Sequence, residues 1–175
     1  ERFDRVVVTT PAEETADLVE GIDETSADAL RELNYNPLVL VHLHSEAVAD
    51  GFGYQVRRTE PLKTLGVTWH ASLFGRDGVY TAFMGGMHDP GAIDRDPDDL
   101  GETAAAEFEQ VMGVEAEVLN VSRVPNAFPA WDRSWAASER VDLPEGLTLA
   151  TNYTGRMGLP SRVREARKLA GELGQ

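Results

Sequence analysis

The sequence contains no cysteine. A disulfide framework and a thiolate-ligated metal site are therefore excluded, because each needs cysteine sulfur. No apolar run approaches the ~20 residues that a membrane-spanning helix needs, and no charged-then-apolar signal segment opens the chain. A chain of 175 residues can bury a substantial core without such staples. We expect a soluble, cytoplasmic protein with no transmembrane segment, and the sequence leaves peripheral membrane association open.

Positive charge is also scarce. The chain has 30 acidic against 16 basic residues, a net charge of −14, and its only lysines are Lys63 and Lys168. Binding to a phosphate backbone needs clustered Lys and Arg, so we expect no nucleic-acid partner. An acidic, lysine-poor composition indicates a halophilic protein, because high salt screens the repulsion among its carboxylates. The alternative is an acidic cytoplasmic protein with no such adaptation.

Common catalytic and nucleotide-binding motifs are missing. There is no Gly-x-Ser-x-Gly, no Walker loop and no Gly-x-Gly-x-x-Gly; the "GFG" at residues 51–53 lacks the third glycine. His42 and His44 alternate on one expected strand face, but no third ligand is evident, and His70 and His88 are isolated in the sequence. We therefore assign no metal site and no catalytic side chain.

Hydrophobic periodicity predicts an α+β fold, a mixed and mainly antiparallel sheet with helices packed on one face. The strands are expected at 4–11 (buried), 37–44, 52–58, 66–74, 79–85, 115–124 and 147–151. The helices are expected from Pro11 onward, at 24–33, from the cap Asp96 to Gly113, within 128–141 and from Pro160. The third of these helices should bury a stripe of Leu100, Ala104, Phe108, Val111 and Met112.

The segment "LATNYTGRMGLPSRVREARKLAGEL", residues 149–173, leads from a strand through a glycine-containing turn into a helix. Unpaired N–H groups and the positive end of the helix dipole at such a turn form an anion-stabilising surface. A reduced flavin carries negative charge near N1 and the C2 carbonyl, which this surface could stabilise. An ordinary strand-to-helix turn is the alternative interpretation.

Four segments in this order resemble the C-terminal part of the protoporphyrinogen oxidase family, within the FAD-dependent amine-oxidase-like superfamily. They read "GFGYQVRRTEPLKTLGVTWHASLF", "YTAFMGGMHDP", "SRVPNAFPAW" and "LATNYTGRMGLPSRVREARKLA". The opening "FDRVVVTTPAEETADLV" resembles the family's strand that leaves the FAD-binding domain. The resemblance extends over almost the whole chain.

The resemblance implies a single fragment, 1–175, that lacks an N-terminal dinucleotide-binding segment. Residues 11–146 would be the substrate-binding domain, and 1–10 and 147–175 remnants of the FAD-binding domain. The implied activity is oxidation of protoporphyrinogen IX to protoporphyrin IX in heme biosynthesis, with FAD as cofactor. The implied partners are a tetrapyrrole substrate and the missing FAD-binding domain, without which we expect the fragment to hold no FAD and to be inactive.

The resemblance also implies site residues. Phe52, between Gly51 and Gly53 and opposite the strand of Trp69, would contact the tetrapyrrole as an aromatic platform, and the predicted substrate-binding residues are Phe52, Gly51, Gly53 and Trp69. The flavin ring would lie, largely through backbone contacts, along Asn152, Tyr153, Gly155, Met157 and Gly158.

Two alternatives stay open at this stage. The parent protein could be another flavin oxidoreductase, such as a carotenoid desaturase or an amine oxidase. The chain could also be a non-catalytic module that binds a flat hydrophobic ligand.

Overall fold

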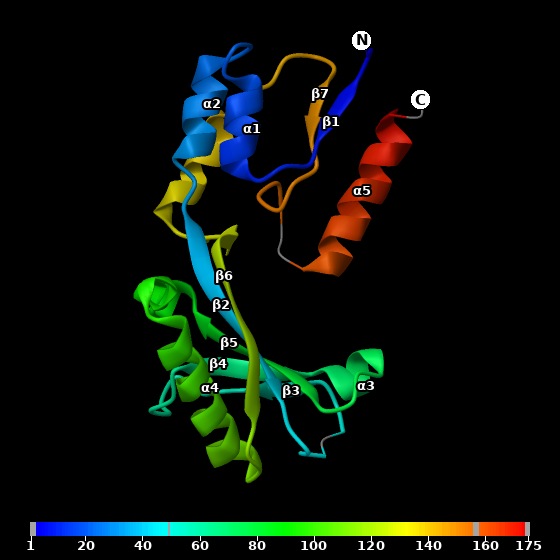
Figure 1. The fold of residues 1–175 in the computed structure, drawn as a ribbon. Helices are drawn as coiled ribbons and strands as arrows, with labels where there is room; N and C mark the ends of the chain where they lie inside the picture. Colours follow the sequence, from blue (N-terminus) through cyan, green and yellow to red (C-terminus); the bar gives the residue numbers. More distant parts are fainter. Residues whose placement is uncertain (1–2, 49, 156–157, 174–175) are drawn as a thin grey trace. The chain divides into compact units, whose positions relative to one another are not determined.

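The structure is a computed structural model and describes residues 3–48, 50–155 and 158–173. The chain divides into two compact units (Figure 1). The terminal unit comprises Glu1–Tyr35 and Phe128–Gln175, and the central unit comprises Asn36–Ala127. Each unit has its own hydrophobic core. The predicted roles of residues 11–146 as a substrate-binding domain and of 1–10 and 147–175 as parts of an FAD-binding domain stay predictions.

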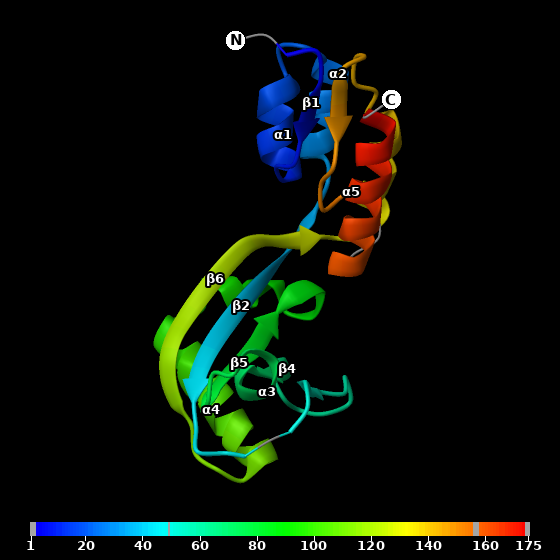
Figure 2. The same ribbon diagram turned by 90° about the vertical axis from the view of Figure 1, so that its right-hand side faces the viewer.

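The central unit is built on a five-stranded sheet with strand order β3-β4-β5-β2-β6. Its strands are β2 (Tyr35–His44), β3 (Gly53–Gln55), β4 (Thr64–Trp69), β5 (Val79–Gly85) and β6 (Glu117–Pro129). The pairs β3–β4, β4–β5 and β2–β5 are antiparallel, and Figure 2 shows β2 and β6 running side by side. The predicted mainly antiparallel α+β fold is confirmed.

Helix α4 (Pro97–Met112) packs its buried side chains against one face of this sheet. The alternation of β2 decides which residues face α4: Val39, Val41 and Leu43 are fully buried, whereas the residues between them are partly exposed. This two-residue period confirms the prediction for β2. The opposite face of the sheet is called the open face below.

The ends of α4 are also as predicted. The Asp96 carboxylate accepts a hydrogen bond from the N–H of Asp98 at 2.9 Å, and Gly113 ends the helix with φ 74°. The predicted core stripe is wrong for Val111, which is 45% exposed. Val111 follows Phe108 by three residues and lies at the border of the stripe, whereas Met112, four residues after Phe108, packs against the core.

In the residues that the structure describes, the terminal unit has a parallel pair of short strands and three α-helices. Its elements are β1 (Val6–Val8), β7 (Leu147–Leu149), α1 (Ala12–Val19), α2 (Glu24–Arg31), α5 (Leu159–Leu173) and the 3-10 helix η3 (Arg133–Arg140). The small side chains of α1 and α2 form most of its core.

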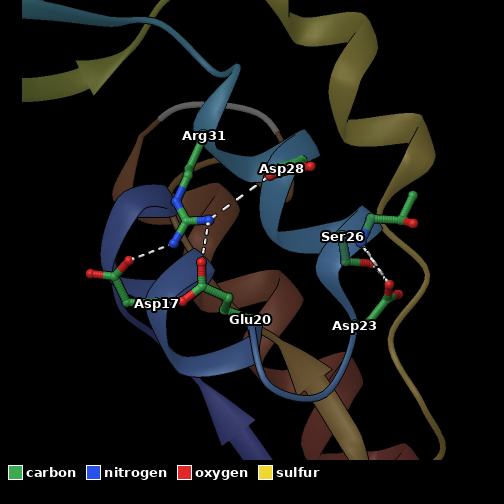
Figure 3. Close-up of polar contacts among 7 residues, drawn as sticks. Asp17, Glu20, Asp23, Ser26, Asp28 and Arg31 are labelled. Carbon is green, nitrogen blue, oxygen red and sulfur yellow. Dashed lines mark hydrogen bonds and ion pairs between the residues drawn. The ribbon is translucent and has the colours of Figure 1, made fainter.

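Polar side chains fix the pair of helices α1 and α2 (Figure 3). Arg31 of α2 forms ion pairs with Asp17 of α1 and with Glu20, which follows α1, at 2.9 and 3.0 Å. The Asp23 carboxylate caps α2 by accepting hydrogen bonds from the N–H groups of Thr25 and Ser26. The ion pairs of Arg31 thereby hold the two helices together in addition to their apolar contact.

Two predicted strands differ from the structure. The strand at 4–11 is shorter and mostly exposed: only Val8 is buried, and Val6 and Val7 are 45% and 40% exposed. Its sheet has two strands in the described residues, so little covers it. The strand at 66–74 stops at Trp69, where the chain turns into the short helix α3 (His70–Phe74). The left-handed Gly75, with φ 64°, ends that helix.

Smaller differences concern element ends. Pro11 caps α1 instead of occupying its first turn, and Pro160 is the second residue of α5. β6 begins at Glu117 and runs to Pro129, past the predicted end at 124. Shifts of this size are usual where a helix or strand end frays.

Candidate functional site

The open face of the central sheet contains a hollow of about 350 Å³. Residues directly opposite one another on antiparallel strands point to the same face. Because Val67 and Ala82 are paired and buried in the core, their neighbours in each strand point to the open face. The residues that line the hollow include Phe52, Gly53, Gln55, Gly66, Thr68 and Phe83.

Gly53 and Gly66 form the floor of the hollow, where the strands β3 and β4 approach each other closely. A Cβ atom on Gly53 would lie 2.1 Å from the carbonyl oxygen of Val67, and one on Gly66 would lie 2.4 Å from that of Tyr54. Gly53 also has φ 150°, which disfavours other residues. The glycines are thus required by the strand pairing, and the absence of their side chains leaves bare backbone on the open face.

Aromatic side chains flank this bare backbone. Phe52 is 70% exposed, which leaves its ring accessible at the hollow. Phe83 of β5 is paired with Gly66 and lines the hollow from the other side. The sequence interpretation missed Phe83; the available signal was a phenylalanine on the outward-facing positions of its strand. A flat apolar ligand could lie on the glycine floor in contact with both rings.

The other two predicted substrate residues lie in the same hairpin but not at the hollow. The indole of Trp69 packs against the core cluster. A Cβ atom on Gly51 would lie 3.1 Å from Cζ3 of Trp69, and the N–H of Trp69 donates to the carbonyl of Phe52. These contacts link Gly51, Trp69 and the backbone of Phe52 within the hairpin. A substrate-binding role for the four predicted residues stays a prediction.

Three polar side chains from separate elements meet on the open face. The hydroxyl of Thr81 lies 2.9 Å from Nδ1 of His42 and 2.8 Å from Nε2 of His70. His70, which is isolated in the sequence, is therefore not isolated in the fold. A single hydroxyl proton can serve only one ring, so Thr81 donates to one imidazole and accepts from the other. Thr81 is paired with Thr68, which lines the hollow.

The environment of His70 predicts a pH-dependent stability. Burial, and then the charges of Arg76 and His42, lower the pKa of His70 from 6.5. Folding therefore favours the neutral ring, and stability should fall as the pH drops below 6.5 and through the lower folded-state pKa. His70→Gln keeps a group that can bond to Thr81 but does not titrate. We expect the variant to lose less stability than the wild type in urea unfolding between about pH 7.5 and pH 5.

The matched control for this experiment is His88→Gln, because His88 is exposed. It should retain the pH dependence of the wild type. An identical pH dependence in His70→Gln and the wild type would contradict the role given to His70.

The side chains of two predicted flavin residues point into the terminal unit. The Asn152 Oδ1 atom accepts a hydrogen bond from the hydroxyl of Tyr35 at 3.0 Å, and that hydroxyl accepts from the N–H of Ala12. The buried hydroxyl of Tyr153 donates to Oγ1 of Thr15 at 2.8 Å. Asn152, through Tyr35, and Tyr153 thus attach the turn to α1.

Gly155 makes room for two charged side chains of α5. A Cβ atom on Gly155 would lie 2.4 Å from Oε1 of Glu165 and 2.9 Å from Nη2 of Arg162. Arg162 is paired with Glu165 at 2.7 Å and also donates to the carbonyl of Thr151. The turn is therefore closed by the first residues of the helix that follows it.

The remaining flavin residues lie at the end of this turn. Gly158 precedes α5 with φ 102°, and its carbonyl accepts from the N–H groups of Ser161 and Arg162. Met157 lies outside the described residues. In the described part of the turn, backbone groups could contact the edge of a flavin ring. Contacts from this one turn would be few and would bind the ring weakly.

The part of the chain that the structure describes has no helix long and apolar enough to cross a membrane. Nor does that part bring three or more His, Asp or Glu side chains together for a metal ion.

The comparison with solved structures defines the class of the fold. A structure from Exiguobacterium sp. 255-15, described as a candidate protoporphyrinogen oxidase, aligns with a TM-score of 0.72 and 21% identity over 100% of this chain and 42% of its own. An oxidoreductase from Methanosarcina mazei aligns with a TM-score of 0.53 and 12% identity, over 87% of this chain and 38% of its own. The chain has the fold of a module found in oxidoreductases.

The comparison of sequences is more specific. Protoporphyrinogen oxidase 1 of Spinacia oleracea is 26% identical over 98% of this chain and 35% of its own length. The chloroplastic enzyme of Oryza sativa subsp. japonica is 25% identical over 96% of this chain and 36% of its own. No family model matches. The predicted resemblance to the C-terminal part of protoporphyrinogen oxidase is confirmed, and the chain spans about a third of the length of these relatives.

Proposed function

We propose that the chain is the substrate-binding portion of an FAD-dependent oxidoreductase that oxidises protoporphyrinogen IX to protoporphyrin IX in heme biosynthesis. The observation that carries this proposal is the hollow on the open face, with a floor of bare backbone and with Phe52 and Phe83 beside it. The hollow lies in the segment that resembles protoporphyrinogen oxidase. Bare backbone and aromatic rings suit a broad flat ligand.

The exposed apolar surface of the terminal unit supports the proposal that a dinucleotide-binding domain outside this chain completes the FAD site. A two-stranded sheet is marginal alone, and parallel sheets are normally covered on both faces. Here Phe3, Val6 and Val7 are exposed, and α5 has no buried residue in its described part. Such a domain would cover β1, β7 and α5 and would hold the ADP half of FAD.

The chain contributes binding and orientation to the proposed reaction. A bound flavin supplies the acceptor for the hydride that leaves the substrate. The glycine floor lets the macrocycle approach the sheet, and the phenylalanine rings contact its apolar surface. Positioning of this kind is a sufficient role for a substrate domain, so no protein acid or base is assigned.

The proposal is tested by adding the missing domain. The chain purified alone should contain no flavin, and should therefore be colourless and without oxidase activity, because the contacts of one turn to a flavin are weak. Co-expression with the dinucleotide-binding segment of the complete reading frame should restore flavin absorbance and the oxidation of protoporphyrinogen IX, followed by porphyrin fluorescence. Stoichiometric FAD in the isolated chain would contradict the division between the two domains.

A pair of variants in the reconstituted protein separates substrate binding from flavin binding. Phe52→Ala should lower kcat/KM about tenfold and leave the flavin bound. Phe74→Ala is the control, because Phe74 is also exposed but does not line the hollow. Oxidation of a carotenoid or an amine instead of protoporphyrinogen would assign the hollow to another flavin oxidoreductase. Ligand binding without turnover would favour the non-catalytic module.

A further inference from the structure

A second cavity, of about 430 Å³, borders the hollow. It lies along the loop that joins β3 to β4, and its wall is completed by residues at the end of β5. Leu65 lines both the hollow and this cavity. The hollow and the second cavity therefore meet at Leu65.

The second cavity is rich in cations, in contrast to the acidic chain as a whole. Arg57, Arg58 and Lys63 line it, and Lys63 is one of only two lysines. Among the described residues, none of these three side chains forms an ion pair with a carboxylate. The basic residues that do form such pairs are Arg31, Arg95, Arg140, Arg162 and Lys168.

The acidic residues at the cavity do not cancel this charge. Asp89 is already paired with Arg95 at 2.8 Å. Glu60 is the other carboxylate in the cavity wall. Three cations thus face one carboxylate that has no ion pair in the described part of the chain. The cavity is a positive site on a chain of net charge −14.

The backbone beneath the cations is held in place. The N–H groups of Lys63 and Thr64 donate to the carboxylate of Glu107 at 2.7 and 2.8 Å. At the other end of the loop, the N–H of Val56 donates to the carbonyl of Leu65. A fixed backbone reduces the ordering cost when the cations bind a ligand.

We propose that this cavity binds the carboxylates of a ligand whose flat apolar ring lies in the hollow. Arg57 and Arg58 can each present the two-pronged guanidinium that carboxylates prefer, and Lys63 adds a third charge. The inference rests on the proposed function and makes it more specific. The site selects a flat apolar ring with carboxylates along one edge and disfavours an uncharged hydrocarbon or an amine of similar size.

The test compares protoporphyrin IX with its dimethyl ester, in which both carboxylates are neutralised. Binding to the 175-residue chain is followed by porphyrin fluorescence. The free acid should bind about tenfold more tightly than the ester, and Arg57→Gln/Arg58→Gln should remove this preference by weakening only the acid. Molar salt should reduce the same preference.

The matched control is Arg133→Gln/Arg167→Gln, which changes the net charge by the same amount at cations outside both cavities. It should leave the preference intact. Equal weakening of acid and ester by Arg57→Gln/Arg58→Gln, or equal loss of preference in both double variants, would overturn the inference and leave the proposed function standing. Failure of the wild type to bind either porphyrin would overturn the inference and the proposed function together. Binding of anionic lipid vesicles through Arg57 and Arg58, with no preference for the free acid, would assign the cations to a membrane surface instead.

Discussion

Replacing Glu107 by alanine should destabilise the chain by about 4 kcal/mol. Glu107 is 9% exposed, and its two carboxylate oxygens accept three hydrogen bonds of 2.7 to 2.8 Å. The donors are the N–H groups of Lys63 and Thr64 and the hydroxyl of Thr64. Loss of Glu107 leaves the two buried donors of Thr64 and the part-buried N–H of Lys63 without this acceptor, at about 1–3 kcal/mol for each buried group.

Glu109→Ala is the control for this measurement, because Glu109 lies on the exposed side of the same helix. Its unfolding free energy in urea should stay within about 0.5 kcal/mol of the wild type. Similar losses in the two variants would show that the contact between Glu107 and the loop contributes little. A selective loss in Glu107→Ala would also support the fixed loop on which the carboxylate site depends.

Replacing Phe108 by alanine should cost about 3–5 kcal/mol. Phe108 is fully buried, and its ring meets that of Tyr80 in an edge-to-face contact with 4.9 Å between centroids. The substitution leaves a cavity between α4 and the sheet and removes the aromatic contact. Thermal or urea unfolding of the purified variant measures the loss.

Val111→Ala on the same helix is the comparison for Phe108. Sequence periodicity assigned both residues to the core, whereas the structure leaves Val111 45% exposed. Its replacement should change stability by less than about 1 kcal/mol. Equal losses at the two positions would contradict the observed orientation of α4.

Local patterns predicted the elements that carry their own signals. The two-residue alternation of Val39, Val41 and Leu43 located β2 and its buried face. The cap Asp96 and the terminal Gly113 gave the ends of α4, because each satisfies backbone groups within one turn of itself. Such signals lie within a few residues and need no knowledge of the rest of the fold.

The hollow could be predicted only in part, because it depends on pairing between strands. The sequence pointed to Phe52 and Gly53, but the pairing of Gly66 with Phe83 is set by the register of β4 and β5. The contact of His42 and His70 through Thr81 likewise joins three elements. The spacing of residues within one segment cannot predict a contact among three separate elements.

The turn at 151–158 shows the reverse case, in which the sequence located a segment but not the direction of its side chains. Asn152 and Tyr153 bond to Tyr35 and Thr15, partners more than a hundred residues away. Their assignment to a flavin therefore stays a prediction about backbone contacts. The expected adaptation to high salt also stays a prediction, which melting temperatures in dilute buffer and in molar KCl would test.

The central claim is that the open face of the sheet in the central unit binds a flat apolar ring. Its most direct test is an NMR titration of the isotope-labelled chain with protoporphyrin IX, in which the backbone amide shifts are followed residue by residue. We expect the shifts to concentrate at 52–55, 65–68 and 81–83, on the three strands that form the hollow. Shifts confined to the terminal unit or to the face covered by α4, or no shifts at all, would contradict the claim.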